Sequence, residues 1–115
     1  MSENPIDPTV YAELKATTGP DFVIELVDTF LEEAPSMLAE LRGARTAGDA
    51  DRFRRAAHSL KSNANTFGAL RLAAQARELE LEGLAAEPAH GVTALDELET
   101  EFARAAAALK VLRDG

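Results

Sequence analysis

The sequence has no cysteine and no tryptophan, and it has only one tyrosine among its 115 residues. Without cysteine, the chain can form neither a disulfide nor a thiolate metal site. Aromatic residues make up 5% of the sequence, whereas hydrophobic residues make up 46% and are mostly alanine and leucine. Because β-branched and aromatic residues favour strands, this composition predicts an all-α fold.

Long apolar runs and an excess of basic residues are also missing. No run approaches the roughly 18–20 residues that a membrane span needs. The first residues, MSENPIDPTV, lack the charged and apolar segments of a secretory signal. The net charge is −8, which argues against binding to nucleic acid or to anionic membranes, since both attract basic surfaces. We therefore expect a cytoplasmic protein that binds neither.

Proline, glycine and capping aspartates divide the chain into five predicted helices. Asp7 and Asp49 are suitable N-caps, and Gly48 and Gly68 suit the left-handed position after a helix. Pro35 interrupts a long apolar stripe without shifting its phase, which indicates a kink rather than a break. The predicted helices cover about residues 8–18, 20–47, 50–67, 69–86 and 92–112.

The short connections between these segments make the long helices antiparallel neighbours. We predict an up-and-down antiparallel four-helix bundle with a short additional N-terminal helix. The chain has the length of one domain, residues 1–115, with a core over about residues 7–112. A bundle of this type closes its core as a monomer.

Charge is distributed unevenly along the sequence. Between Arg52 and Arg77 there are 6 basic residues and no acidic one, while the rest of the chain has 6 basic and 20 acidic residues. Two interpretations remain open: chance clustering on solvated helix faces, or a patch for an anionic group or an acidic partner.

His58 lies inside this basic segment. On a helical wheel it points away from the apolar stripe of its helix, whose residues fall between about 160° and 240° from it. A core histidine is therefore disfavoured, and an idle surface histidine is the remaining alternative. Imidazole is a nucleophile near neutral pH. Lys61, one turn on, can pair with an anion bonded to the ring, and the small Ser62 leaves room for another protein to approach. The apolar stripe consists of Phe53, Ala56, Leu60, Ala64 and Phe67.

The segment HSLKSNANTFGAL, residues 58–70, resembles the signature of histidine-containing phosphotransfer (HPt) domains. The signature has a histidine, then an apolar residue, a lysine, a small residue and a glycine at two, three, four and ten positions beyond it. His58, Leu60, Lys61, Ser62 and Gly68 occupy those positions. The family commonly has glycine or serine where Ser62 stands, so the variation is mild. The resemblance extends over roughly residues 7–112.

This resemblance implies a phosphocarrier without an ATP-binding or kinase site of its own. His58 would accept a phosphoryl group on Nε2 from the aspartyl phosphate of a receiver domain, or from a partner kinase. It would then pass the group to a response-regulator receiver. Lys61 would stabilise the phosphoryl group, while Mg²⁺ would come from the receiver. The implied partners are receiver domains and a sensor or hybrid histidine kinase, and Arg54, Arg55 and Asn65 are candidate partner contacts.

Two other classes of function are alternatives to a phosphocarrier. A helical adaptor that binds signalling proteins without phosphate explains the fold and the charge, but it leaves the His58 signature to coincidence. An enzyme lacks support, because the sequence has no phosphate-cradling glycine loop and no pair of Glu-x-x-His motifs on facing helices for a metal site. Asp51 is expected to form surface ion pairs, and His90 is expected to be idle in a loop.

Overall fold

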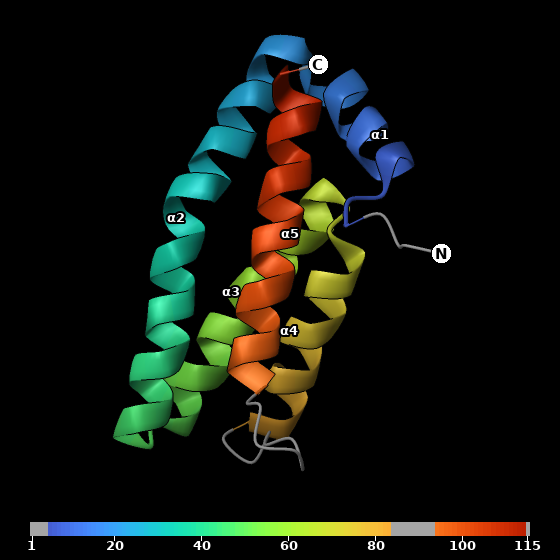
Figure 1. The fold of residues 1–115 in the computed structure, drawn as a ribbon. Helices are drawn as coiled ribbons and strands as arrows, with labels where there is room; N and C mark the ends of the chain where they lie inside the picture. The colour runs from blue at the N-terminus through green and yellow to red at the C-terminus, as the bar shows by residue number, and fades with distance from the viewer. Residues whose placement is uncertain (1–4, 84–93, 115) are drawn as a thin grey trace.

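The computed structural model describes residues 5–83 and 94–114, and its regular secondary structure there is entirely helical. This confirms the all-α fold class. Four long helices form the bundle, and the shorter α1 packs across one end of it (Figure 1). No helix in these two ranges is long and apolar enough to cross a membrane. The helices are α1 (Pro8–Thr18), α2 (Pro20–Ala47), α3 (Ala50–Phe67), α4 (Leu70–Glu82) and α5 (Ala94–Asp114).

The helix ends follow from local chemistry. The side chain of Asp7 accepts a hydrogen bond from the backbone of Thr9 at 2.9 Å, and that of Asp49 accepts one from Arg52 at 3.1 Å. These bonds satisfy amides that have no partner within the helix. Helix α2 continues through Pro35 without a break, and its ribbon bends along its length (Figure 1).

The end of α4 differs from the prediction. We expected this helix to reach about Ala86, but it ends at Glu82 because Gly83 adopts φ 64° and ψ −144°. A glycine with positive φ leaves the helical conformation at no steric cost, so one residue within the apolar pattern terminates it. Residues 84–86, His90 and Val92 lie outside the described residues.

The core is formed by the apolar stripes of all five helices. The buried Phe30 of α2 packs against two other aromatic rings, with its ring centroid 5.1 Å from that of Phe67 and 5.9 Å from that of Phe102. Burying each large side chain removes apolar surface from water, which contributes about 1.5–3 kcal/mol per residue. The predicted stripe of α3 is buried throughout: Phe53, Ala56, Leu60, Ala64 and Phe67.

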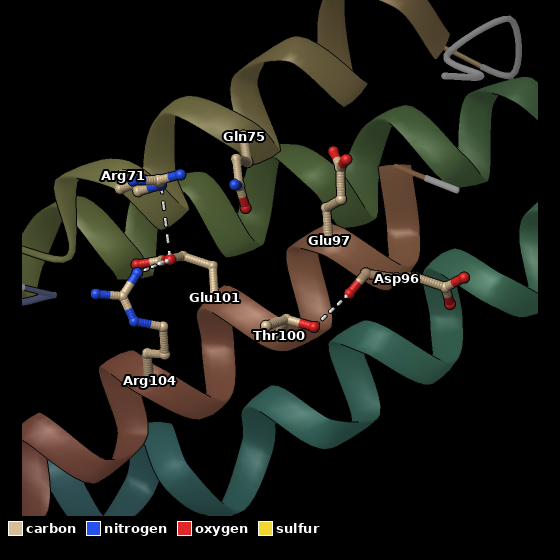
Figure 2. Close-up of a pocket in the computed structure, with 7 residues that line it drawn as sticks. All are labelled: Arg71, Gln75, Asp96, Glu97, Thr100, Glu101 and Arg104. Carbon is tan, nitrogen blue, oxygen red and sulfur yellow. Dashed lines mark hydrogen bonds and ion pairs between the residues drawn. The ribbon is translucent and has the colours of Figure 1, made fainter. Parts of the chain in front are cut away.

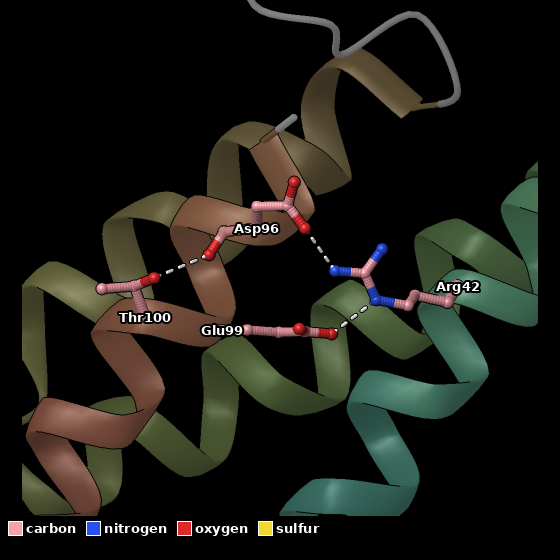
Figure 3. Close-up of polar contacts among 4 residues, drawn as sticks. All are labelled: Arg42, Asp96, Glu99 and Thr100. Atoms are coloured by element: carbon pink, nitrogen blue, oxygen red, sulfur yellow. Dashed lines mark hydrogen bonds and ion pairs between the residues drawn. The ribbon is translucent and has the colours of Figure 1, made fainter. Parts of the chain in front are cut away.

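Ion pairs join α5 to α2 near both ends of the helix pair. Arg42 of α2 reaches Asp96 and Glu99 of α5, both at 2.6 Å (Figure 3). At the other end of the same helix pair, Arg113 contacts Asp28 at 2.5 Å. Pairs this exposed contribute little to stability, but contacts at both ends favour one register of α5 along α2.

Candidate functional site

The structure places His58 on the solvent side of α3. Its side chain is 58% exposed, whereas Ala57 and Leu60 beside it are buried. The orientation follows from helix periodicity, because the apolar stripe occupies the opposite side of the helix. The ring is therefore accessible to another protein without any change in the core.

A glutamate from the next helix holds the imidazole. Glu80 of α4 lies with Oε2 2.8 Å from Nδ1 of His58, and its Oε1 accepts a hydrogen bond from Nζ of Lys61 at 2.7 Å. Only 19% of the Glu80 side chain and 23% of the Lys61 side chain are exposed. One carboxylate thus connects two residues of the α3 signature.

Glu80 was absent from the sequence-based site. A usable signal was present, because residues equally distant from a helical turn lie opposite one another in an antiparallel pair. Glu80 stands about as far after Gly68 as His58 stands before it. The choice among neighbouring positions on α4 depends on how that helix is rotated, which the spacing does not specify.

The contact with Glu80 distinguishes the two ring nitrogens of His58. The pKa of Glu80 is lowered, mainly by the hydrogen bond from Lys61 and further by the one from His58, although burial opposes the shift. An ionised carboxylate only accepts hydrogen bonds, so the nitrogen facing it, Nδ1, carries the proton. The neutral ring then has its lone pair on Nε2, the nitrogen that Glu80 does not contact.

The surface beside His58 is open and shallow. Ser62, one turn beyond His58 on α3, is exposed. A depression of about 190 Å³ runs between α3 and α4, with Lys61 and Arg77 contributing positive charge and the exposed Leu70 an apolar contact. Asn65 also lines this depression. Its lining suits a protein surface that presents both apolar and acidic side chains.

Comparisons with known proteins agree with this geometry. The family model described as the Hpt domain matches residues 25–108. This chain belongs to the HPt domain family. A crystal structure of histidine-containing phosphotransfer protein B (HptB) from Pseudomonas aeruginosa PAO1 is similar, with a TM-score of 0.86 and 32% sequence identity. The match covers 98% of this chain and 97% of that one. No curated protein sequence gives a significant match.

The glycine of the HPt signature, Gly68, lies where the chain between α3 and α4 contacts α1. Gly68 adopts φ 81°, and its carbonyl accepts a hydrogen bond from the amide of Asp7 at 2.8 Å. A Cβ at this position would lie 2.8 Å from Cβ of Val10 and 3.0 Å from the carbonyl oxygen of Asp7. Glycine is therefore needed both for its backbone conformation and for the close approach of α1. It lies about 15 Å along α3 from His58, given the rise of a helix.

The basic segment of the HPt chain is interleaved with carboxylates from other positions. Arg52 bonds Glu40 at 2.5 Å, and Arg54 contacts Asp51 at 2.7 Å, as expected for Asp51. Arg55 is exposed, and its charge adds to the lowering of the pKa of Glu40, which comes first from the Arg52 hydrogen bond. The surface near His58 therefore mixes charges of both signs, rather than forming the wholly basic patch suggested by the linear sequence.

Among the described residues there is no group of three or more His, Asp or Glu side chains arranged to hold a metal ion.

Proposed function

We propose that His58 is the residue that carries the phosphoryl group in this HPt protein, and that it does so on Nε2. Membership of the family assigns the chain a histidine phosphotransfer role in phosphorelays. The observation that supports His58 in particular is its contact with Glu80, which occupies Nδ1 and leaves Nε2 free of that carboxylate on an exposed side chain. The ring is thus held with its nucleophilic atom directed toward an approaching partner.

The transfer step follows from this arrangement. The Nε2 lone pair attacks the phosphorus of an aspartyl phosphate on a receiver domain, and the bond from phosphorus to the aspartate oxygen breaks. The aspartate leaves as a carboxylate, while the ring becomes a phosphoimidazolium that keeps its proton on Nδ1. Glu80 offsets the positive charge that develops on the ring. Phosphoryl transfer requires mainly positioning and charge neutralisation, and Glu80 contributes to both.

Lys61 has a second role in this proposal. Its ammonium group has three donors and uses one toward Glu80. Another can bond a phosphoryl oxygen on Nε2, which would stabilise the phosphorylated form. We expect Lys61→Ala to slow transfer or to shorten the lifetime of the phosphohistidine while the bundle stays folded. Unchanged kinetics in both directions would leave Lys61 with no role beyond its contact with Glu80.

The proposed partners are receiver domains and a sensor or hybrid histidine kinase, and this chain would act on them as a monomeric, cytoplasmic carrier without kinase activity. The receiver would supply Mg²⁺. It would dock over α2 and α3 around His58, and the depression between α3 and α4 extends that surface. Ser62 keeps the approach to Nε2 open, while Arg54, Arg55 and Asn65 lie exposed around it.

The proposal is tested by incubating the protein with a receiver domain that carries radioactive phosphate on its aspartate, and then mapping any acid-labile label. Wild-type protein and the control His90→Gln should be labelled, whereas His58→Gln should not. A surface substitution of this kind changes stability by less than about 0.5 kcal/mol, so the melting temperature should stay nearly constant. Label retained in His58→Gln, or lost in His90→Gln, would contradict the assignment.

A further inference from the structure

A second polar site lies between α4 and α5, away from His58. It is a cleft of about 370 Å³, which falls within the usual range of about 300–1,000 Å³ for small-molecule sites. Gln75 of α4 and Glu101 of α5 face each other across it (Figure 2). Gln75 projects from a different side of α4 than Glu80 does, given the periodicity of the helix. The cleft and the His58 site therefore use separate surfaces.

Glu101 is the only charged residue buried within the described part of the chain, with 4% of it exposed. Its Oε1 accepts a hydrogen bond from Arg104 at 2.9 Å and lies 3.7 Å from Nε of Arg71. Its Oε2 has no hydrogen-bond partner among the described residues, and the same is true of Oε1 of Gln75. Two residues that line one cleft therefore each have a buried acceptor oxygen for which the described residues supply no donor.

The chemistry of these atoms defines what the cleft can bind. Buried acceptors are nearly always hydrogen-bonded, because leaving one unpaired costs the desolvation of that group. Both free atoms are oxygens, so a matching ligand must present N–H or O–H groups rather than an anion. Glu97, an exposed carboxylate at the same cleft, adds negative charge, and Arg71 and Arg104 of the lining add positive charge. The carboxylate of Asp96 is paired with Arg42.

We propose that this cleft binds a small alkylammonium or alkylguanidinium compound, whose N–H groups bond Oε2 of Glu101 and Oε1 of Gln75. A bare metal ion fits poorly, because it needs more oxygen ligands than these two. An organic cation spreads its charge, directs its donors, and places its alkyl part against the helix walls. Charge-assisted hydrogen bonds to Glu101 give the larger part of the affinity.

The test is a titration of the full-length, ¹⁵N-labelled protein, followed by NMR. Ethylammonium and ethylguanidinium are the probes, and tetramethylammonium is the control, since it has the same charge but no N–H donor. We expect saturable shifts at millimolar concentration, confined to residues that line the cleft and including the side-chain amide of Gln75, for at least one probe. Absence of such shifts, or equal shifts with tetramethylammonium, would overturn the proposal.

Variants locate the binding atoms. Glu101→Gln should weaken binding of the probe by about tenfold, because it removes a charge-assisted hydrogen bond. Glu78→Gln, the same change at an exposed position of α4, should bind as the wild type does. If Glu101→Gln fails to fold, Gln75→Leu provides the same test without removing a charge. Full affinity in the variant that folds would overturn the proposal.

This experiment is independent of the proposed phosphoryl transfer. Binding is measured without any phosphoryl donor, and His58→Gln should bind the probe with unchanged affinity. Failure of one proposal therefore leaves the other standing.

Discussion

The two glutamates at the interfaces of α4, Glu80 and Glu101, differ in how their carboxylate oxygens are hydrogen-bonded. Glu80 belongs to α4 and faces α3, while Glu101 belongs to α5 and faces α4. Each carboxylate has positively charged or proton-bearing groups beside it. Both oxygens of Glu80 are partnered, one by Lys61 and one by His58. Within the described ranges, only one oxygen of the more deeply buried Glu101 has a partner.

The difference shows how similar groups serve different purposes. A carboxylate whose oxygens are both engaged positions the groups that bond it, so Glu80 fixes the ring of His58 through Nδ1 and leaves Nε2 without a contact to this carboxylate. A buried carboxylate with one free oxygen retains binding capacity, so Glu101 is suited to a ligand. Exposure reinforces this contrast, because the His58 side of the molecule is open to a protein surface and the cleft admits only a small molecule.

The strongest test of this contrast blocks access to His58. Ser62→Gln places a long side chain on the path to Nε2, and reacting atoms must come within about 3–3.5 Å for transfer. We expect transfer from a phosphorylated receiver to slow by about 100-fold, while helicity stays the same because glutamine is a better helix former than serine. Ser62→Ala is the control and should transfer normally. Rapid transfer by Ser62→Gln would mean that receivers approach from another side.

The next test concerns Gly68, the residue of the HPt signature whose role here is in packing and backbone conformation. Gly68→Ala should lower the free energy of unfolding by about 2–3 kcal/mol, from positive φ together with the clash with α1. Gly48→Ala is the matched control: φ there is 71°, and nothing lies within 4 Å of an added Cβ. It should cost only about 1 kcal/mol. If urea unfolding shows that both variants lose the same free energy of unfolding, the close approach of α1 to Gly68 does not affect stability.

A smaller effect is expected at Glu80 itself. Glu80→Gln keeps a side chain of the same shape but removes the charge that offsets the developing imidazolium. Transfer should slow on the order of tenfold, measured by single-turnover kinetics. Glu78→Gln, which is exposed on the same helix, should transfer at the wild-type rate. Glu80→Gln should also leave amine binding in the α4–α5 cleft unchanged. Loss of that binding would show that the two sides of α4 are coupled.

The smallest effect is a change in titration. The pKa of Glu80 is lowered in the folded protein, so its contacts stabilise the fold above the ordinary pKa of a carboxyl group and are lost as the pH falls through the lowered value. Lys61 makes the largest contribution to that shift. In Lys61→Ala the pKa of Glu80 should rise toward its ordinary value, as followed by ¹³C NMR of the carboxyl group. An unchanged pKa of Glu80 in this variant would show that Lys61 does not stabilise the Glu80 carboxylate.

Much of the fold could be predicted from spacing alone. Apolar residues at three- and four-residue steps, capping aspartates and helix-ending glycines predict the bundle and place His58 opposite the buried side of α3. The prediction for α4 was wrong at its end, because the periodic pattern of the helix continued past Gly83 while the backbone left the helical conformation there. Local pattern does not show which of several glycines ends a helix.

The sequence by itself determined the elements of this protein and the direction of His58, because both depend on residues within a few turns of one another. The tertiary structure alone decided what surrounds that histidine. Glu80 reaches His58, and Gln75 faces Glu101, only because α4 packs at one particular rotation against α3 and α5. That rotation results from side-chain packing throughout the core, which no local spacing encodes.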